Sequence, residues 1–320
     1  MAPYDWAGAP GGALLLFFAL IADAALPGGA ALGRLLPHPR RLVASITLEL
    51  DRRLNRDKRS DRARVFRGAL IVLVLAGAAA TLGWLVEEAG RGVAFGWVAE
   101  FLALTVMISQ RGTFRQGREA PADDHREAPA DHHREAPADD HRPAREAIEA
   151  VAGRFAARVV APVFWYALLG LPGVATHAAV NAMAGVIGGP GRRQAAFGLA
   201  AGRLDDVLTA IPARLAALLF VVAALFAPGA SPAGALRVAW RDSGKHPSFS
   251  AGWPLAAVAG ALDLALAGPD AQTGRKTDWI GSGRARATAS DVSRVLYLFV
   301  VACLLVAAVA AGAVILSLTS

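Results

Sequence analysis

Two adjacent acids, Asp205 and Asp206, lie in the stretch GRLDDVLTAIPARL, directly before an apolar run that continues through Phe220. Arg203 precedes the acids and Arg214 follows them. Arginine has a planar fork that binds phosphate or carboxylate with two hydrogen bonds. Taken alone, the acid pair is equally typical of an exposed helix start or cap. A helix-end pair and a functional pair are both compatible with this pattern.

Four further stretches combine residue types that bind anions or transfer protons. They are LLPHPRRL, RDSGKHPSFSAGW, TDWIGSGRAR and SDVSRVL, which contain His38, Arg40, Arg241, Asp242, Lys245, His246, Arg284, Asp291 and Arg294. As a histidine, His246 could orient a phosphate or transfer a proton. It could equally be a loop histidine that is hydrogen-bonded to the backbone. Trp253 and Trp279 favour anchoring at a membrane interface over stacking on a planar ligand.

The segments that carry these stretches are rich in apolar residues. Of the 320 residues, 55% are hydrophobic, which indicates an integral membrane protein. A spanning helix needs about 20 apolar residues. The clearest candidates are 295–318 and 68–86, and two weaker candidates, each interrupted by an acid, are 12–26 with Asp23 and 92–109 with Glu100.

Prolines interrupt the remaining apolar stretches, 159–189 and 215–236, at Pro162, Pro172 and Pro228. Pro212 follows Asp206 by six residues and is expected to limit or kink the helix that contains the acid pair. Re-entrant or half-length helices would accommodate these prolines. The sequence therefore predicts an all-α, polytopic integral membrane protein with about 4–6 spanning or re-entrant helices.

Basic residues are concentrated in the polar loops. They are frequent between residues 34 and 67, whereas residues 1–12 contain none. The positive-inside rule then places the N-terminus outside and the polar loops in the cytoplasm, in a multi-pass protein of the inner (cytoplasmic) membrane. The net charge of +7 does not indicate a nucleic-acid partner, because the basic residues lie beside membrane segments. The lipid bilayer is the expected partner of these loops.

One segment differs in composition from the rest. Residues 118–145, REAPADDHREAPADHHREAPADDHRPAR, repeat an eight-residue unit three times and lack large apolar side chains. Such a segment cannot bury enough surface to order itself, so we expect a flexible insert within a single membrane domain of residues 1–320. Without defined ligand spacing, a solvated linker is favoured over a divalent-metal site at its histidines, His125, His132, His133 and His141.

Taken in chain order, the polar stretches resemble the adenosylcobinamide-phosphate synthase family, the CobD/CbiB membrane proteins of cobalamin biosynthesis. The resemblance begins at ALIADAALP and PHP and continues at REAIEAVAGRFAARVVAPVFWYALLGLPGV and AVNAMAGVIG. It extends through GRLDDVLTAIPARL and WRDSGKHPSFSAGWPLAAVAGAL to WIG and DVSRVL. Each match is short, but their number, order and spacing cover nearly the whole chain.

The resemblance implies an ATP-dependent ligase that joins a corrinoid, adenosylcobyric acid, to the amine of aminopropanol or its phosphate, giving adenosylcobinamide or its phosphate. It also implies Mg2+ and ATP, with oxygen ligands for the metal and cations for phosphate. It points to Asp205 and Asp206 as metal ligands and, together with Asp242 and His246, as catalytic residues. The residues that it implies for substrate or phosphate binding are His38, Asn181, Arg203, Arg214, Arg241 and Arg294.

The sequence departs from the family pattern in several blocks, including the one that begins at Glu149. Where the family has a second glutamate, an asparagine, an aspartate and a glycine, this chain has Gly153, Arg154, Ala157 and Arg158. The first acid of the block is present as Glu149. An apolar or basic side chain cannot replace a carboxylate ligand. A non-catalytic membrane paralogue with a binding or regulatory role is therefore the alternative to an active ligase.

Overall fold

The computed structural model describes residues 11–25, 38–55, 60–91, 93, 95–123, 141–188, 192–269 and 277–319, without the side chains of 120–123, 192–194 and 249. In these residues the regular structure is helical, and the β-type pairing is limited to two isolated bridges, Leu264–Arg284 and Leu266–Ile280. The prediction of an all-α fold is confirmed. The chain divides into two compact units, unit 1 (residues 1–109, 161–211 and 307–320) and unit 2 (110–160 and 212–306).

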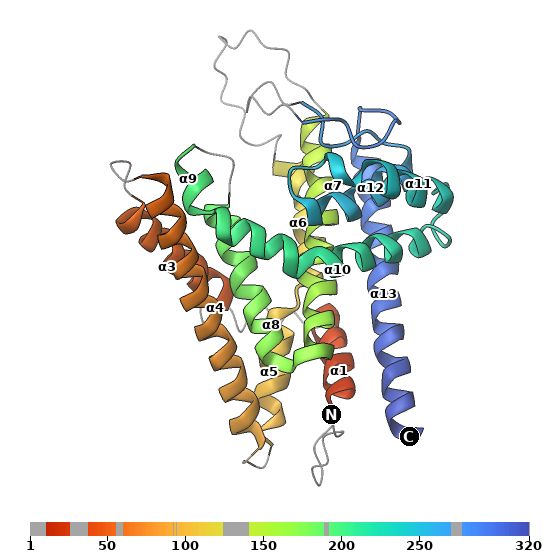
Figure 1. Cartoon of the computed structure of the whole chain (residues 1–320). Helices are drawn as coiled ribbons and strands as arrows, with labels where there is room; N and C mark the ends of the chain where they lie inside the picture. The colour runs from red at the N-terminus through yellow and green to blue at the C-terminus, as the bar shows by residue number, and fades with distance from the viewer. Residues whose placement is uncertain are drawn as a thin grey trace. The chain divides into compact units, whose positions relative to one another are not determined.

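Unit 1 is built around two helices that pack against each other, α4 (Asp61–Arg91) and α8 (Ala161–Ile187) (Figure 1). The shorter helices α1 (Gly12–Ala25), α3 (Pro39–Leu54), α5 (Trp97–Met107) and α9 (Arg192–Phe197) pack around this pair. The first part of α10 (Leu199–Ala223) and the end of α13 (Ala289–Thr319) also belong to it. Its core is apolar and includes Ile71, Val72, Val180, Met183, Ile187 and Phe197.

Unit 2 contains α6 (Gln110–Asp123), α7 (Arg142–Phe155), α11 (Pro232–Asp242), α12 (Phe249–Leu262) and most of α13. Helix α7 packs against α6 and α12, and α12 also packs against α11. A turn of π-helix, η1 (Ala156–Val160), follows α7, and a 3-10 turn, η2 (Ser243–Lys245), follows α11. The ring of Phe155 contacts Phe220 of α10 and Phe299 of α13, with centroids 4.8 and 5.6 Å away.

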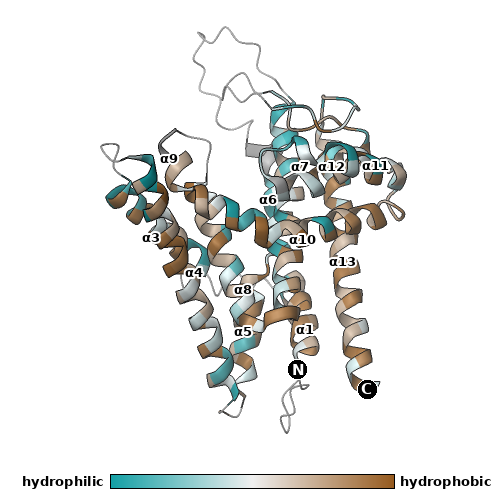
Figure 2. Ribbon diagram, in the orientation of Figure 1, coloured by the Kyte–Doolittle hydropathy of each residue, from teal (hydrophilic) through white to brown (hydrophobic). Residues whose placement is uncertain are grey.

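Four helical runs of the described chain are long and apolar enough to cross a membrane: 61–91, 142–187, 199–223 and 289–319. Figure 2 shows that α13 is apolar over most of its length, and side chains such as Leu304, Val309 and Leu316 are exposed on it. Exposed apolar side chains on a long helix are typical of a surface that faces lipid. The two clearest predicted spans lie within α4 and α13. The chain is therefore a polytopic membrane protein.

The two weaker candidate spans form only short helices. Helix α1 has 14 residues and α5 has 11. A helix needs about 20 residues to cross a bilayer, so both are too short. Glu100 on α5 accepts a hydrogen bond from the hydroxyl of Tyr166 on α8, with 2.6 Å between the oxygens. The acid that interrupts the apolar pattern of α5 thus has a partner inside unit 1.

A break in α8 accounts for the proline-containing stretch 159–189. Gly170 has φ +65° and ψ −153°, a conformation that residues with a Cβ rarely adopt, and Pro172 follows it. A Cβ on Gly170 would also lie 2.6 Å from Oε2 of Glu87 on α4. The run 142–187 therefore consists of shorter helical parts, in agreement with the half-length helices expected for this stretch.

Of the two outcomes predicted for Pro212, a helix limit or a kink, the limit is wrong, because α10 continues through the proline from Leu199 to Ala223. Proline cannot donate to the carbonyl of Leu208, one turn earlier, but the indole N–H of Trp165 does so at 3.0 Å. The apolar stretch 215–236 contains the end of α10 and the start of α11, which are joined by turns.

The prediction of a flexible insert over 118–145 is wrong at the two ends of this segment, which are helical. Residues 118–123 continue α6, and residues 142–145 begin α7. The guanidinium of Arg145 donates to the carbonyl of Ala285 at 3.1 Å, and Nδ1 of His141 lies 3.1 Å from the carbonyl of Ala287. These contacts hold the start of α7 in unit 2. Residues 124–140, with His125, His132 and His133, lie outside the described residues, and the single domain over 1–320 stays a prediction.

Candidate functional site

The carboxylate of Asp205 belongs to a line of polar side chains inside unit 1. Its Oδ1 accepts a hydrogen bond from the amide of Asn181 at 3.1 Å, and Oδ1 of Asn181 accepts one from Nη1 of Arg40 at 3.0 Å. Arg40 is only 8% exposed, and its Nη2 donates to the carbonyl of Met107 at 3.4 Å. The neutral amide of Asn181 therefore connects a buried guanidinium on α3 to a carboxylate on α10.

Helices α8 and α10 meet through residues that are one turn apart on each helix. His177 and Asn181 are four residues apart, as are Asp205 and Thr209, so each pair shares a helix face. Nε2 of His177 lies 3.2 Å from Oγ1 of Thr209. His177 is fully buried, and its Nδ1 has no hydrogen-bond partner in the part of the chain that the structure describes. His177 was not predicted from the sequence, although its four-residue spacing from Asn181 was a signal that could have found it.

The other predicted residues of unit 1 lie at the starts of α3 and α10. Nδ1 of His38 accepts a hydrogen bond from the backbone N–H of Arg40 at 3.3 Å and so caps the first turn of α3. Arg203 is exposed, and Asp206 is half-buried. The first part of α10 therefore carries two carboxylates and an exposed guanidinium.

The acid pair can hold a metal ion only with ligands from elsewhere. Among the described residues, no group of three or more His, Cys, Asp or Glu side chains is placed to hold one. Mg2+ is commonly bound by one or two carboxylates together with water and substrate phosphates. Asp205 and Asp206 are adjacent on one helix and do not form a closed protein site, so a magnesium ion there would need water and substrate phosphates as further ligands.

Asp242 in unit 2 is an enclosed carboxylate, with a side chain that is 0% exposed. It accepts hydrogen bonds from Nε and Nη2 of Arg241 at 2.9 and 2.7 Å and from the N–H of Gly281 at 2.9 Å, and Nζ of Lys245 lies at 2.8 Å. The Arg241 guanidinium, aided by Lys245 and the Gly281 amide, holds the pKa of this carboxylate well below its usual value despite burial. Asp242, which Arg241 holds in place, therefore fixes the end of α11 to the loop at Gly281.

His246 and Arg214 also contact protein groups in unit 2. Nδ1 of His246 lies 3.0 Å from both the backbone N and the backbone O of Ser248, which matches the loop histidine bonded to backbone. The guanidinium of Arg214 lies over the ring of Trp253, 4.9 Å from its centroid. Such a cation–π contact orients both side chains.

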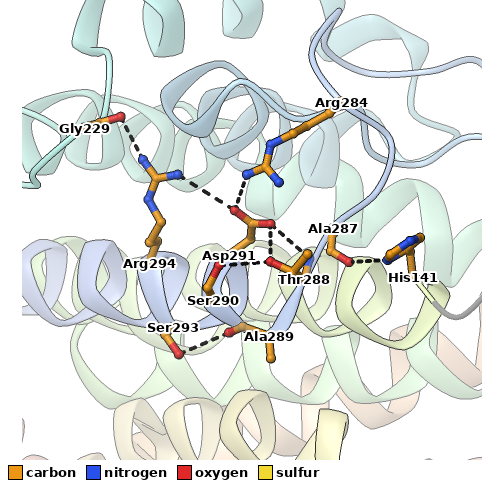
Figure 3. A network of polar contacts seen from close by, with 10 residues as sticks. All are labelled: His141, Gly229, Arg284, Ala287, Thr288, Ala289, Ser290, Asp291, Ser293 and Arg294. Carbon is orange, nitrogen blue, oxygen red and sulfur yellow. Dashed lines mark hydrogen bonds and ion pairs between the residues drawn. The ribbon is translucent and has the colours of Figure 1, made fainter.

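Arg294 belongs to a network around Asp291 at the start of α13 (Figure 3). Oδ2 of Asp291 accepts hydrogen bonds from the N–H and the hydroxyl of Thr288 at 2.9 and 2.8 Å, as in a capping box. Arg284 donates to Oδ1 of the same carboxylate. Nη1 of Arg294 lies 3.8 Å from that oxygen, and its Nη2 donates to the carbonyl of Gly229 at 2.8 Å. Arg294 thus ties α13 to the turn before α11.

The ten predicted site residues therefore divide between the units. Unit 1 contains His38, Asn181, Arg203, Asp205 and Asp206, and unit 2 contains Arg214, Arg241, Asp242, His246 and Arg294. The structure brings Asn181 together with Asp205, and Arg241 together with Asp242. In unit 2 the bonds of Asp242 and Arg294 favour structural roles, so unit 1 carries the stronger candidate for chemistry.

The fold and the polar line of unit 1 define an all-helical, polytopic membrane protein with acids and arginines among its helices. The CobD/Cbib protein family matches residues 16–299. The chain is 36% identical over 311 residues to the "Cobalamin biosynthesis protein CobD" of Sinorhizobium sp, covering 92% of this chain and 95% of the relative. It is 32% identical over 300 residues to a protein of the same name from Rhodobacter capsulatus, covering 90% and 92%.

A relative with a different name is the "Cobalamin biosynthesis protein CbiB" of Salmonella choleraesuis (strain SC-B67), which is 30% identical over 279 residues, with 83% of this chain and 87% of the relative covered. The chain belongs to the CobD/CbiB family, as its motifs indicate. No solved structure matches it.

Proposed function

We propose that this protein acts in cobalamin biosynthesis and forms an amide bond between the carboxylate of adenosylcobyric acid and the amine of aminopropanol or its phosphate, in an ATP-dependent reaction. The family match covers most of the chain, and the relatives are named as cobalamin biosynthesis proteins. The observation that carries the ligase proposal is the adjacent pair Asp205 and Asp206, with Asp205 held in place by Asn181.

The residues of unit 1 suit the binding of a phosphate compound with its metal. Asp205 and Asp206 would hold Mg2+, which supplies positive charge to the phosphate oxygens of ATP. Arg203 is exposed on the same helix and would bind a phosphate or carboxylate oxygen. Asn181 fixes the position of Asp205, and Arg40 in turn fixes the amide of Asn181.

A non-catalytic paralogue with a binding or regulatory role is the second candidate, and one observation favours it. The block at the junction of α7 and η1 has Gly153 and Ala157 where the family pattern has acids. The remaining acid, Glu149, accepts a hydrogen bond from the N–H of Ala267 at 2.8 Å. A carboxylate used in this way stabilises unit 2 and does not make up for the missing acids.

Growth of a bacterial strain that lacks its own synthase, and must make cobalamin from cobyric acid, tests the ligase proposal. We expect the full chain to restore growth as the strain's own synthase does when supplied on a plasmid. Failure to grow, with the protein inserted in the membrane at a matched level, would contradict the ligase. A gain of growth on combining Gly153→Glu, Arg154→Asn and Ala157→Asp would then favour the paralogue.

A further inference from the structure

Two half-buried arginines share one helix face at the junction of α7 and η1 in unit 2. Arg154 and Arg158 are four residues apart, which makes them neighbours on the helix. Gly153 and Ala157 lie on the same half-buried face, whereas Phe155 is fully buried. A π-helical turn next to an α-helix is frequent at functional sites.

The charges of the two arginines are not balanced by the protein that the structure describes. In that part of the chain, neither guanidinium has a hydrogen bond or an ion pair, and the charge that acts on Arg158 is the guanidinium of Arg154. Other arginines of α7 are engaged, since Arg142 pairs with Glu146 and Arg145 donates to a carbonyl. Like charges one turn apart repel, and partly buried charges are normally paired. An anion from outside the chain would relieve this repulsion.

There is room for such an anion beside the arginines. A Cβ built on Gly153 would meet no atom within 4 Å. Arginine binds phosphate with two parallel hydrogen bonds, and two arginines on one face can bind one phosphate together. We propose that Arg154 and Arg158 form a binding site for a phosphate group in the space beside Gly153. This site stands apart from the ligase proposal, because it requires binding and no reaction.

The phosphate has two sources that share the same chemistry, a soluble phosphate compound and the headgroup of an anionic lipid. Calorimetric titration of inorganic phosphate into the purified full chain, in a nonionic detergent, tests the soluble source. We expect saturable binding that weakens by about tenfold or more in Arg154→Gln/Arg158→Gln. The control Arg115→Gln/Arg237→Gln removes two exposed arginines from unit 2 and should change the affinity by less than about twofold.

Vesicles of phosphatidylcholine, with and without phosphatidylglycerol, test the lipid source. The number of phosphatidylglycerol molecules that remain bound after extraction is counted by native mass spectrometry. Fewer retained molecules in Arg154→Gln/Arg158→Gln than in the control variant would assign the site to lipid. If the double variant changes neither phosphate binding nor lipid retention, the proposed site does not exist.

If the double variant does not fold, a second variant can test the proposed phosphate site. Gly153→Leu retains both arginines and fills the space beside them. We expect it to weaken phosphate binding or lipid retention while the helix content measured by circular dichroism is unchanged. Unchanged binding in a folded Gly153→Leu protein would contradict the proposal.

Discussion

The indole N–H of Trp165 on α8 donates a hydrogen bond to the carbonyl of Leu208 on α10, with 3.0 Å between the atoms. In a regular α-helix this carbonyl accepts the N–H of residue 212, which here is proline and has no N–H. A carbonyl without a donor costs free energy in an environment without water. Trp165 therefore supplies the donor that allows α10 to continue through Pro212.

Replacing the indole tests this relationship. Trp165→Phe should lower the free energy of unfolding by about 0.5–1.5 kcal/mol through the lost hydrogen bond, in addition to lost packing. The same change should cost less in a Pro212→Ala background, where residue 212 donates to Leu208 itself. Unfolding in detergent, followed by circular dichroism, measures both costs, and Trp84→Phe, at a 53% exposed tryptophan, is the control. Equal costs in the two backgrounds would show that the hydrogen bond contributes nothing.

Gly170 should resist substitution because of its backbone. Gly170→Ala places a Cβ at φ +65° and 2.6 Å from the carboxylate of Glu87, so we expect a loss of stability of about 1 kcal/mol or more. Gly185→Ala on the same helix is the matched control, because its Cβ meets no atom within 4 Å. That change should be neutral or stabilising by up to about 1 kcal/mol. Melting temperatures in one detergent compare the two, and equal values would contradict the role given to Gly170.

The stability of unit 2 should depend on pH through Asp242. A depressed carboxyl pKa stabilises the folded state above the ordinary aspartate pKa of about 3.9, and this stabilisation is lost as the pH falls toward the lower folded pKa. The Asp242→Asn protein should therefore be less stable than the wild type at pH 7. This difference in the free energy of unfolding should become smaller below about pH 4. Asp61→Asn, at an 83% exposed aspartate, is the control. Parallel stability curves for wild type and Asp242→Asn would contradict the prediction.

Local patterns predicted the long membrane helices but not the contacts between them. The apolar runs of α4 and α13 exceed the length that a bilayer requires, and that signal needs no knowledge of the fold. The passage of α10 through Pro212 depends on Trp165, a residue distant in sequence. The ends of the octapeptide segment are helical because they join helices that pack in unit 2, which composition alone does not reveal.

The candidate site was predictable in its residue types and only partly in its arrangement. Family motifs indicated Asn181 and Asp205, and the structure adds the hydrogen bond between them and the position of Arg40. His177 was missed because its spacing from Asn181 indicates only a shared helix face, and its partner on α10, Thr209, is known only from the structure. Two residues that contact Asp242, Arg241 and Lys245, lie in RDSGKH itself, but the N–H of Gly281 comes from a distant loop, so this enclosure of Asp242 could not be inferred from RDSGKH alone.

Asp205→Asn and Asp206→Asn test the candidate metal pair most directly. Each exchange keeps the side-chain shape but removes the charge that binds Mg2+, so each should abolish growth in the complementation assay at unchanged protein level. In the purified protein, the Mg2+ concentration for half-maximal amide formation should rise by about tenfold or more. Glu149→Gln is the control and should keep growth, because its Oε1 can still accept the N–H of Ala267. Full growth of the Asp205→Asn/Asp206→Asn double variant would remove the pair from the reaction and leave it as a helix-end acid pair.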